Sequence, residues 1–470
     1  MTSSLTMKFG GTSVGSPEAL TKVADIVLRY SKERERLIVV VSAMNGVTDA
    51  LIRGAQTAAS GDDQTYQSIV AELHVRHYQA IDELFTFDSE RASLSAQIDR
   101  YLNDFSTFCH SVYVLGEVTP RAMDTIASLG ERINARIVAA LLRQRGVPSE
   151  AVDATELIVT DATFQNAVPL MEASRVKCAT RLSPLLDQGI IPVVTGFIGA
   201  TEGGITTTLG RGGSDFSAAI IGACMESSEV WTWTDVDGVM SADPRIVPEA
   251  RVIPELSYNE VAELAYFGAK VLHPRTIRPV VENNIPLWVK NTFNPTCPGT
   301  RIARTPEAVP GTVKAVTAIK GLSLVTVEGR GMLGVPGIAA RTFSAVASQQ
   351  ASVLMITQAS SEQSISFVIP TEAAPSVIRA IESEMALELT RRDIERVWSM
   401  DDVVIVTAVG AGMRTTPGIA VRIFGALSQA NINVIAMAQG SSDCSVSLVV
   451  AAEAAAEAVR QIHNRVILGV

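Results

Sequence analysis

The sequence is poor in aromatic residues, which make up 5% of its 470 residues although hydrophobic residues reach 47%. Small aliphatic side chains must therefore fill the core. This composition favours layered α/β domains over a β-sandwich. The length is sufficient for about two to four domains.

Cysteine is scarce and unpatterned. The five cysteines include no C-x-x-C pair, so they indicate reduced, buried thiols rather than a disulfide framework. No apolar run approaches about 18 residues, and the amino terminus lacks a charged region followed by an apolar stretch. We therefore expect a cytoplasmic protein with no membrane span and no signal peptide.

Positive charge is also limited, because the formal net charge is −10 and only eight residues are lysine. Such a chain is poorly suited to bind a phosphate backbone, so no nucleic-acid partner is expected. An anionic ligand would need a locally basic site. His74 and His77 are three residues apart on a predicted helix, but no third ligand has suitable spacing, and no metal site built from side chains is expected.

Strand–helix–strand units are predicted at the amino end. Residues 5–9 form a strand, Ser16 and Pro17 begin a helix, and the β-branched run LIVVVSA forms the next strand. Residues 50–145 are predicted to be mainly helical, with further strands at IIPVVTGFIGA and VWTWTDVDGVM. Four prolines between 292 and 312 indicate a domain linker.

An internal duplication follows this linker. A shift of 81 residues places 331–368 on 412–449 without a gap, and 16 of the 38 aligned positions are identical. Each copy predicts strand, glycine loop, helix, strand, polar turn and strand, as in a small ferredoxin-like unit. Two copies are too few for a solenoid, so the duplication favours a paired regulatory module.

Two glycine-rich turns are candidate anion sites. Residues 206–215, TTTLGRGGSD, predict a strand, a tight turn and the start of a helix, which points backbone N–H groups at an anion. Residues 8–15, KFGGTSVG, place a lysine and two glycines after a strand, without the Gly-Lys pair of a Walker A loop. Taken alone, KFGGTSVG is equally consistent with an ordinary turn.

Taken in order, KFGGTSV, GFIGAT with TTTLGRGGSD, WTDVDGVMSADPR and FGAKVLHP closely resemble the aspartokinases of the amino-acid kinase family. The resemblance covers the whole chain, and the duplication resembles a tandem ACT regulatory module. It implies an amino-acid kinase-type α/β/α sandwich over 1–303. Two ferredoxin-like ACT modules are implied at 314–395 and 400–470, with the last residues available to complete the first.

The resemblance also implies a reaction, in which the β-carboxylate of L-aspartate attacks the γ-phosphate of ATP with Mg²⁺. The products are 4-phospho-L-aspartate and ADP, at the first step towards lysine, threonine and methionine. A carboxylate is already ionised at neutral pH, so the site must mainly align two anions and neutralise the transferring phosphoryl group. The chain ends at Val470, so we expect a monofunctional enzyme. A related kinase acting on glutamate, N-acetylglutamate or UMP is one alternative, and an inactive amino-acid sensor is another.

The same resemblance assigns site residues. Lys8 is expected to contact the transferring phosphate, and Asp215 to hold Lys8. Arg211 is expected to bind a carboxylate of aspartate, and Glu131 to balance its ammonium group. The other substrate-binding residues implied are Ser42, Thr48, Phe197 and Ser214. The nucleotide-binding residues implied are Lys8, Gly10, Gly11, Thr12, Ser13, Thr234, Asp235, Met240, Arg245 and Lys270, with Gly10 and Gly11 donating N–H groups.

Met240 departs from the family pattern, in which a tyrosine lies near the nucleotide; methionine can still pack on a flat base but loses a hydrogen bond or stack. Gln358 and Gln439 each precede a serine-rich turn in their repeat. This feature resembles threonine-inhibited aspartokinases, including those fused to homoserine dehydrogenase. We expect threonine as the effector, while Glu362 and Asp443 leave lysine as the alternative. Because ACT modules work in pairs, a homodimer or larger homo-oligomer is expected.

Overall fold

The structure is a computed structural model that describes residues 4–86, 88–269, 272–304, 312–332, 335–359, 363–439 and 443–469. The chain divides into two compact units. Unit 1 comprises Met1–Val239, Pro254–Tyr258 and Val271–Pro306. Unit 2 comprises Met240–Ile253, Asn259–Lys270 and Glu307–Val470, so two segments that precede the predicted boundary at 303 belong to it.

Unit 1 is built on an eight-stranded sheet in the order β3-β5-β2-β1-β8-β10-β11-β9. Its strands are β1 (Ser4–Phe9), β2 (Arg36–Val41), β3 (Ser149–Val152), β5 (Ile191–Thr195), β8 (Glu229–Thr234), β9 (Glu255–Ser257), β10 (Leu287–Asn291) and β11 (Thr300–Ala303). The strands from β3 to β10 in this order are parallel, and β11 is antiparallel to β10. Because β11 pairs inside the sheet, the expected linker over 292–312 is wrong for residues 300–303.

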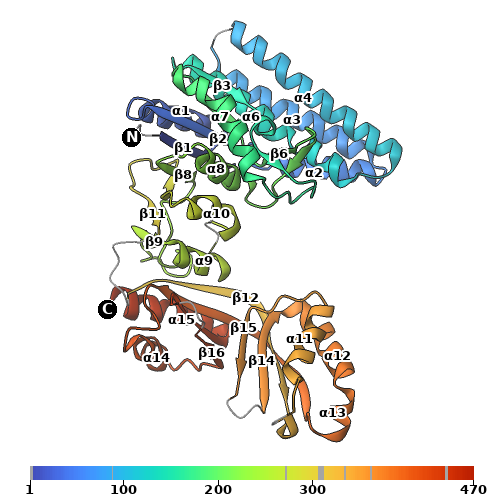
Figure 1. Cartoon of the computed structure of the whole chain (residues 1–470), viewed down its shortest axis with the longest axis vertical. Helices are drawn as coiled ribbons and strands as arrows, with labels where there is room; N and C mark the ends of the chain where they lie inside the picture. The colour runs from blue at the N-terminus through green and yellow to red at the C-terminus, as the bar shows by residue number, and fades with distance from the viewer. Residues whose placement is uncertain are drawn as a thin grey trace. The chain divides into compact units, whose positions relative to one another are not determined.

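Helices cover both faces of this sheet, as Figure 1 shows. The helices of unit 1 are α1 (Pro17–Tyr30), α2 (Val47–Ala59), α3 (Asp63–Leu84), α4 (Asp88–Leu115), α5 (Pro120–Ala127), α6 (Leu129–Gln144), α7 (Met171–Asp187), α8 (Gly213–Cys224) and α10 (Pro274–Glu282). Of these, α3 and α4 pack against α2 and against each other. Successive side chains of β1 point to opposite faces of the sheet, so this strand contacts the helices on both faces. Leu5, Met7 and Phe9 join the core formed with α1 and α6, whereas Lys8 forms an ion pair with Asp215 of α8. The α/β/α sandwich and the helical stretch over 50–145 are thus confirmed.

A three-stranded sheet accompanies the main one, with β4 (Val159–Thr160), β6 (Ile198–Thr201) and β7 (Thr206–Thr208). β7 leads through the turn at 209–212 into α8, so the strand–turn–helix predicted for TTTLGRGGSD is confirmed. Near the amino terminus, the Ser16 side chain caps α1 by accepting the N–H of Ala19, and Pro17 is the first residue of this helix, as predicted. Among the described residues, no helix has the length and apolarity needed to cross a membrane.

Unit 2 contains one six-stranded antiparallel sheet in the order β13-β14-β12-β15-β17-β16. Its strands are β12 (Val313–Glu328), β13 (Met355–Gln358), β14 (Ser364–Pro370), β15 (Arg396–Gly410), β16 (Ala436–Ala438) and β17 (Ser445–Ala451). The helices are α9 (Tyr258–Tyr266), α11 (Ile338–Ser348), α12 (Ala374–Glu384), α13 (Ala386–Arg391), α14 (Ile419–Gln429), α15 (Ala455–Ile462) and a π-helical turn at His463–Leu468. Both repeats therefore have the ferredoxin-like order predicted from the duplication.

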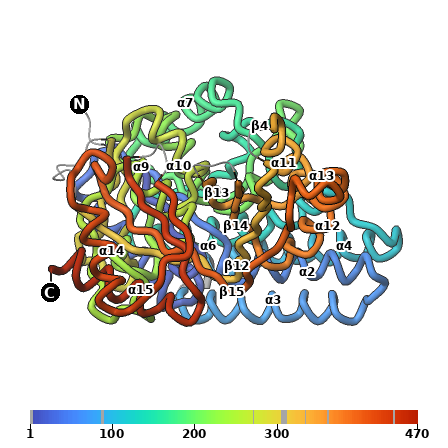
Figure 2. The backbone as a smooth tube through the Cα atoms, turned by 90° about the horizontal axis from the view of Figure 1, so that it is seen from below, coloured from blue at the N-terminus to red at the C-terminus, as the bar shows by residue number. Residues whose placement is uncertain are grey.

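The first strand of one repeat pairs with the first strand of the other: β12 and β15 are antiparallel neighbours along almost their whole length (Figure 2). Val325 and Val327, near the end of β12, pack in the core of the first repeat with Val377 of α12. Val313 and Val316, near its start, pack instead in the core of the second repeat. Each hydrophobic core of unit 2 thus receives side chains from both repeats.

Candidate active site

A cavity of 720 Å³ in unit 1 is formed by the segments that follow β1, β2 and β7 together with the starts of α2, α6 and α8. The carboxyl ends of parallel strands meet at one edge of a sheet, which is where ligands bind in open α/β folds. Its lining includes every residue predicted to bind the substrate and both predicted catalytic residues: Lys8, Ser42, Thr48, Glu131, Phe197, Arg211, Ser214 and Asp215. Gly11 from the predicted nucleotide set also lines it.

Positive charge in this cavity comes from Lys8 and from the start of α8. The Lys8 side chain is 9% exposed, and its Nζ lies 2.8 Å from Oδ1 of Asp215 in the first turn of α8. The N-cap Gly212 has φ 71°, a left-handed conformation that favours glycine. The first N–H groups of a helix lack intrahelical partners and favour an anion, and the exposed Arg211 immediately precedes them.

Close packing fixes the turn before α8. Phe197 is a non-glycine residue with φ 67°, and its carbonyl accepts the N–H of Leu209 at 2.9 Å. A Cβ on Gly213 would lie 2.6 Å from Cδ2 of Phe197, so only glycine fits there without a shift of the ring. Left-handed backbone in a bulky residue costs roughly 1–3 kcal/mol and concentrates at functional sites. The geometry at Phe197 is thus held by its neighbours rather than by its own preference.

Glu131 is a buried carboxylate in the cavity wall, with only 3% of the residue exposed. Its Oε1 accepts the N–H of Ala43 at 3.3 Å, whereas Oε2 has no hydrogen-bond partner among the described residues. Burial raises the pKa of Glu131 to about 8, although backbone hydrogen bonds, including the one from Ala43, act in the opposite direction. A cationic group entering the cavity would supply the missing partner.

Asp124 of α5 is a cavity residue that was not predicted. The residue is 1% exposed, and its carboxylate accepts the N–H of Gln165 at 2.9 Å and both the N–H and hydroxyl of Thr208 at 3.0 and 2.8 Å. Burial raises its pKa, and these hydrogen bonds oppose the shift. Asp124 therefore ties α5 to the strand that leads into α8. The available signal was a carboxylate seven residues before Glu131 within a helical, largely apolar stretch.

Several residues of the predicted nucleotide set are occupied by contacts within unit 1. The N–H of Gly10, expected to donate to phosphate, instead donates to the carbonyl of Trp233 at 3.1 Å. The buried hydroxyl of Ser13 donates to the same carbonyl at 3.3 Å and accepts from Thr292 at 2.7 Å. Thr12 is exposed. Thr234, at the end of β8, donates its hydroxyl to the exposed Asp235 at 3.2 Å.

The rest of the predicted nucleotide set lies in unit 2 or outside the described residues. Arg245 pairs with Asp243, with Nη2 2.7 Å from Oδ2, and this contact lowers the pKa of Asp243. Met240 forms a β-bridge with Val252. Lys270 lies outside the described residues.

The two predicted effector residues are at equivalent positions in the repeats. Gln358 is the last residue of β13 and lines a cavity of 320 Å³ together with the start of α11. Gln439 follows β16, and its amide donates to the carbonyl of Met413 at 3.4 Å. Asp443 accepts the N–H of Arg414 at 2.9 Å, and Glu362 lies outside the described residues.

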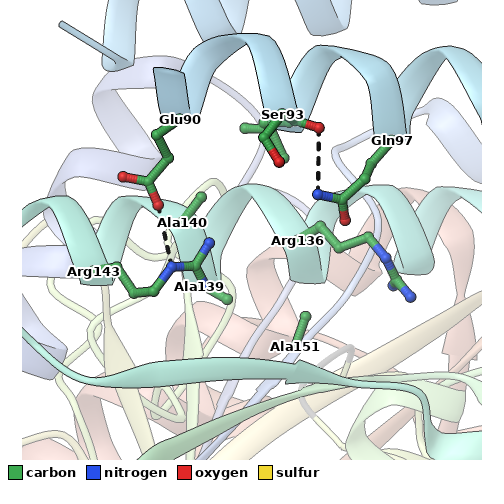
Figure 3. A pocket seen from close by; sticks show the side chains of 9 residues that line it. Glu90, Ser93, Gln97, Arg136, Ala139, Ala140, Arg143 and Ala151 are labelled. Atoms are coloured by element: carbon green, nitrogen blue, oxygen red, sulfur yellow. Dashed lines mark hydrogen bonds and ion pairs between the residues drawn. The ribbon is translucent and has the colours of Figure 1, made fainter. Parts of the chain in front are cut away.

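A further cavity, of 580 Å³, lies between α4 and α6, and none of the described residues that line it is a predicted site residue (Figure 3). Its two arginines are already paired, Arg143 with Glu90 at 3.1 Å and Arg136 with Asp153 at 3.0 Å. These pairs leave little free positive charge for an anion.

The two histidines of α3 lie in different environments. His77 is fully buried, its Nδ1 lies 2.7 Å from the carbonyl of Leu73, and burial lowers its pKa to about 4. His74 is 3.7 Å from Asp99. Within the described ranges, no group of three or more His, Cys, Asp or Glu side chains is placed to hold a metal ion.

Comparison with known proteins places the two units in known families. The Amino acid kinase family matches residues 5–291, and the ACT domain family matches residues 325–385 and 406–466. The two ACT matches coincide with the two repeats found in the sequence.

Relatives of similar sequence match almost the whole chain. The bifunctional aspartokinase/homoserine dehydrogenase 1, chloroplastic, of Arabidopsis thaliana is 40% identical over 97% of this chain, which spans 50% of that protein's length. Aspartokinase 1, chloroplastic, of the same plant is 33% identical over 97% of this chain and 79% of its own length.

Crystal structures of E. coli aspartokinase III are similar over 98% of this chain and 99% of theirs, at 29% identity. The TM-score is 0.77 for its complex with aspartate and ADP, in the R-state. It is 0.79 for its complex with lysine and aspartate, in the T-state. A mixed sheet with helices on both faces and a lysine-bearing cavity, in a chain that also carries paired ACT repeats, is the architecture of an amino acid kinase family member with ACT domains. Within the amino acid kinase family, the chain belongs to the aspartokinases.

Proposed function

We propose that this chain catalyses ATP-dependent phosphorylation of the β-carboxylate of L-aspartate. The observation that carries the proposal is one cavity that combines the Lys8–Asp215 ion pair, Arg211 and the buried Glu131. The charges of these groups are opposite to those of aspartate, which has two carboxylates and one ammonium, and to that of the phosphate which aspartate must approach. The bound aspartate and ADP of E. coli aspartokinase III support the same assignment.

In the proposed reaction, a β-carboxylate oxygen of aspartate forms a bond to the γ-phosphorus of ATP. The bond from that phosphorus to the β,γ-bridging oxygen breaks, and ADP leaves. Arg211 would bind the α-carboxylate as a two-pronged donor, while Glu131 accepts hydrogen bonds from the ammonium. Lys8, held by Asp215, and the N–H groups at the start of α8 would stabilise charge on the phosphoryl oxygens.

The remaining residues have supporting roles in this proposal. Ser42, Thr48, Ser214 and Phe197 would shape the aspartate pocket, and Gly11 would allow close approach of the phosphates. Thr234, Asp235, Met240, Arg245 and Lys270 are proposed for the nucleotide.

Mg²⁺ would arrive on the ATP phosphates. This ion keeps several waters and needs only one or two carboxylates, so a cage built by the protein is not required. Asp215 in the cavity wall is a carboxylate of the required kind. When bound, the ion would neutralise phosphate charge.

Trapping the product tests this function. The purified protein is incubated with Mg²⁺, ATP, L-aspartate and hydroxylamine, and formation of aspartyl hydroxamate is followed. We expect hydroxamate with aspartate, and none with the Lys8→Met variant, although that variant should remain folded. Phosphate transfer to glutamate, N-acetylglutamate or UMP instead of aspartate would contradict the proposal. Absence of any transfer, with an amino acid still bound, would favour a sensor.

We further propose threonine as the allosteric effector, with Gln358 and Gln439 as its ligands. Among the residues that the structure describes, none of the eight lining the cavity beside Gln358 is acidic, which favours a small polar effector over the ammonium of a lysine side chain. Lysine is the rival, because it occupies a crystal structure of E. coli aspartokinase III. Titration of both amino acids against activity separates them: inhibition by threonine that weakens in Gln358→Ala is expected, and inhibition by lysine alone would reject the assignment.

We also propose that the chain forms a homodimer or a larger homo-oligomer through its ACT repeats. Sedimentation equilibrium of the full chain measures the mass directly. A monomer at micromolar concentration, with and without threonine, would contradict this proposal.

A further inference from the structure

The segment 291–298 begins at the last residue of β10 and has no role in the function proposed above. β1, β8 and β10 are parallel neighbours in the sheet, so their carboxyl ends lie at the same edge. The turn after β1 carries Gly10 and Gly11, and the end of β8 carries Thr234 and Asp235. The segment after β10 is therefore placed to contact both.

Thr292 makes these contacts and is fully buried. Its N–H donates to the carbonyl of Thr234 at 2.9 Å, and its hydroxyl donates to the hydroxyl of Ser13 at 2.7 Å. The Ser13 hydroxyl in turn donates to the carbonyl of Trp233 at 3.3 Å, which also accepts the N–H of Gly10. One threonine thus links the turn after Lys8 to the last two residues of β8.

The same segment holds the turn that follows β8. Asn291 and Asn294 both donate their side-chain amides to Oδ1 of Asp237, at 2.8 and 3.1 Å. The side-chain oxygen of Asn291 also accepts the N–H of Phe293 at 2.8 Å, which fixes the amide orientation. The turn at 234–239 is therefore tied to the segment at two points.

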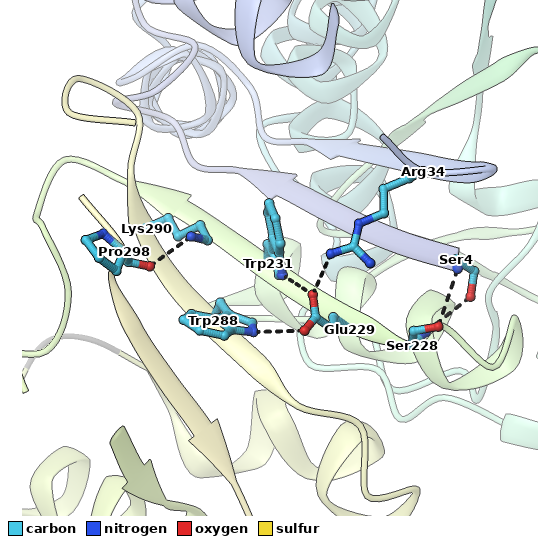
Figure 4. Close-up of polar contacts among 8 residues, drawn as sticks. All are labelled: Ser4, Arg34, Ser228, Glu229, Trp231, Trp288, Lys290 and Pro298. Atoms are coloured by element: carbon cyan, nitrogen blue, oxygen red, sulfur yellow. Dashed lines mark hydrogen bonds and ion pairs between the residues drawn. The ribbon is translucent and has the colours of Figure 1, made fainter. Parts of the chain in front are cut away.

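Lys290 and Pro298 close the base of the segment, as Figure 4 shows. The ammonium of Lys290 donates to the carbonyl of Pro298 at 2.8 Å and lies 4.7 and 4.9 Å from the ring centres of Trp231 and Trp288. Both indoles donate to the carboxylate of Glu229, at 2.9 and 3.3 Å. Because a hydrogen bond closes it across its base, 291–298 can act as a fixed support for its neighbours.

We propose that Thr292 is a positioning residue for the phosphoryl transfer. Its hydroxyl holds the turn after Lys8 at a fixed distance from the Thr234–Asp235 segment, and so sets the nucleotide relative to Lys8. Thr292 does not touch the substrates itself. The proposal rests on the proposed aspartate kinase function and adds a residue that determines nucleotide use but not aspartate use.

The test uses Thr292→Val in the full chain, because valine keeps the shape and the backbone bond to Thr234 but removes the hydroxyl. We expect kcat/KM for ATP to fall by roughly 5- to 30-fold, the effect of losing one or two hydrogen bonds. The KM for aspartate should stay within about twofold of wild type. Thr292→Ser should restore kcat/KM for ATP to within about threefold, because it restores the donor.

Thr6→Val is the matched control. Thr6 and Ser227 form another buried hydroxyl pair, 2.8 Å apart, on the amino-terminal half of β1. This variant should lose similar thermal stability but keep kcat/KM for ATP within about twofold. Ser13→Ala should reduce kcat/KM for ATP at least as much as Thr292→Val, since it also removes the bond to the Trp233 carbonyl. The double variant should be no worse than Ser13→Ala, since Thr292→Val removes only the bond that Ser13→Ala has already broken.

Two outcomes would overturn the proposal. In one, Thr292→Val matches Thr6→Val in both stability and ATP kinetics. In the other, it raises the KM for aspartate as much as that for ATP. Failure of the proposed function is distinct from both, because the wild-type protein would then form no aspartyl hydroxamate at all.

Discussion

The raised pKa of Glu131 predicts that aspartate affinity depends on pH. Its carboxylate is buried, its Oε2 has no partner among the described residues, and its pKa is about 8. In the free protein, roughly half of the Glu131 side chains are ionised at pH 8, about 9% at pH 7 and about 1% at pH 6. The ammonium of aspartate binds the ionised form, so it lowers this pKa and a proton leaves on binding.

The sign and size of the effect follow. Because binding releases a proton, the affinity for aspartate rises as the pH approaches the pKa of Glu131 in the free protein. Below that pKa the affinity falls as the pH falls. The KM for aspartate should increase by about fivefold from pH 8 to pH 7, and by about ninefold more from pH 7 to pH 6. Initial rates of ADP release at saturating ATP, with aspartate varied at each pH, measure this directly.

Glu131→Gln is the control for this prediction, because an amide does not titrate in this range. The variant should have a high KM for aspartate that is nearly constant between pH 6 and pH 8. Calorimetry of aspartate binding at pH 7, in two buffers of different ionisation enthalpy, should give a release of about 0.9 proton per aspartate in wild type. A KM that is flat in wild type, or a pH dependence that survives in Glu131→Gln, would refute the reasoning.

Other predictions concern packing and a buried charge. Gly213→Ala should destabilise the fold by roughly 1–3 kcal/mol and reduce kcat/KM for aspartate, because the new Cβ would meet the Phe197 ring. Gly425→Ala is the control, because a Cβ there would have no atom within 4 Å, and it should lower neither stability nor kcat/KM. Thermal unfolding and initial rates measure both variants. Glu260→Gln should lower the urea-unfolding free energy by roughly 3–5 kcal/mol, because the Lys314 ammonium lies 3.0 Å away and both side chains are at most 10% exposed. Recovery in the double variant with Lys314→Met is expected, and a double variant as unstable as the single one would contradict this account.

Local signals in the sequence predicted much of the fold. Ser16 and Pro17 define the start of α1 through contacts within one turn. The duplication predicted the order of elements in both repeats, and TTTLGRGGSD predicted β7, its turn and α8. These features depend on neighbours in the chain or on a repeated pattern, which a sequence displays directly.

Features that depend on distant packing were not predictable in the same way. His77 was assigned to a helix from the sequence, but its full burial depends on the packing of α3 against other helices and was not predicted. The hydroxyl of Ser13 is occupied by Thr292, 279 residues away along the chain. Likewise, the burial that shifts the pKa of Glu131 comes from neighbours such as Ala43, 88 residues earlier. The sequence indicated residues that line the cavity, whereas the raised pKa of Glu131 required the assembled structure.

The sharing of β12 and β15 between the two repeats restricts how this part of the protein can be divided or changed by evolution. A fragment ending near 395 would leave the long edge of β12 without its partner, and unpaired edges promote aggregation. The two repeats should therefore unfold in a single cooperative transition. A substitution at Val313 would be felt in the core of the other repeat, so the duplicated halves, once fused, could no longer diverge independently.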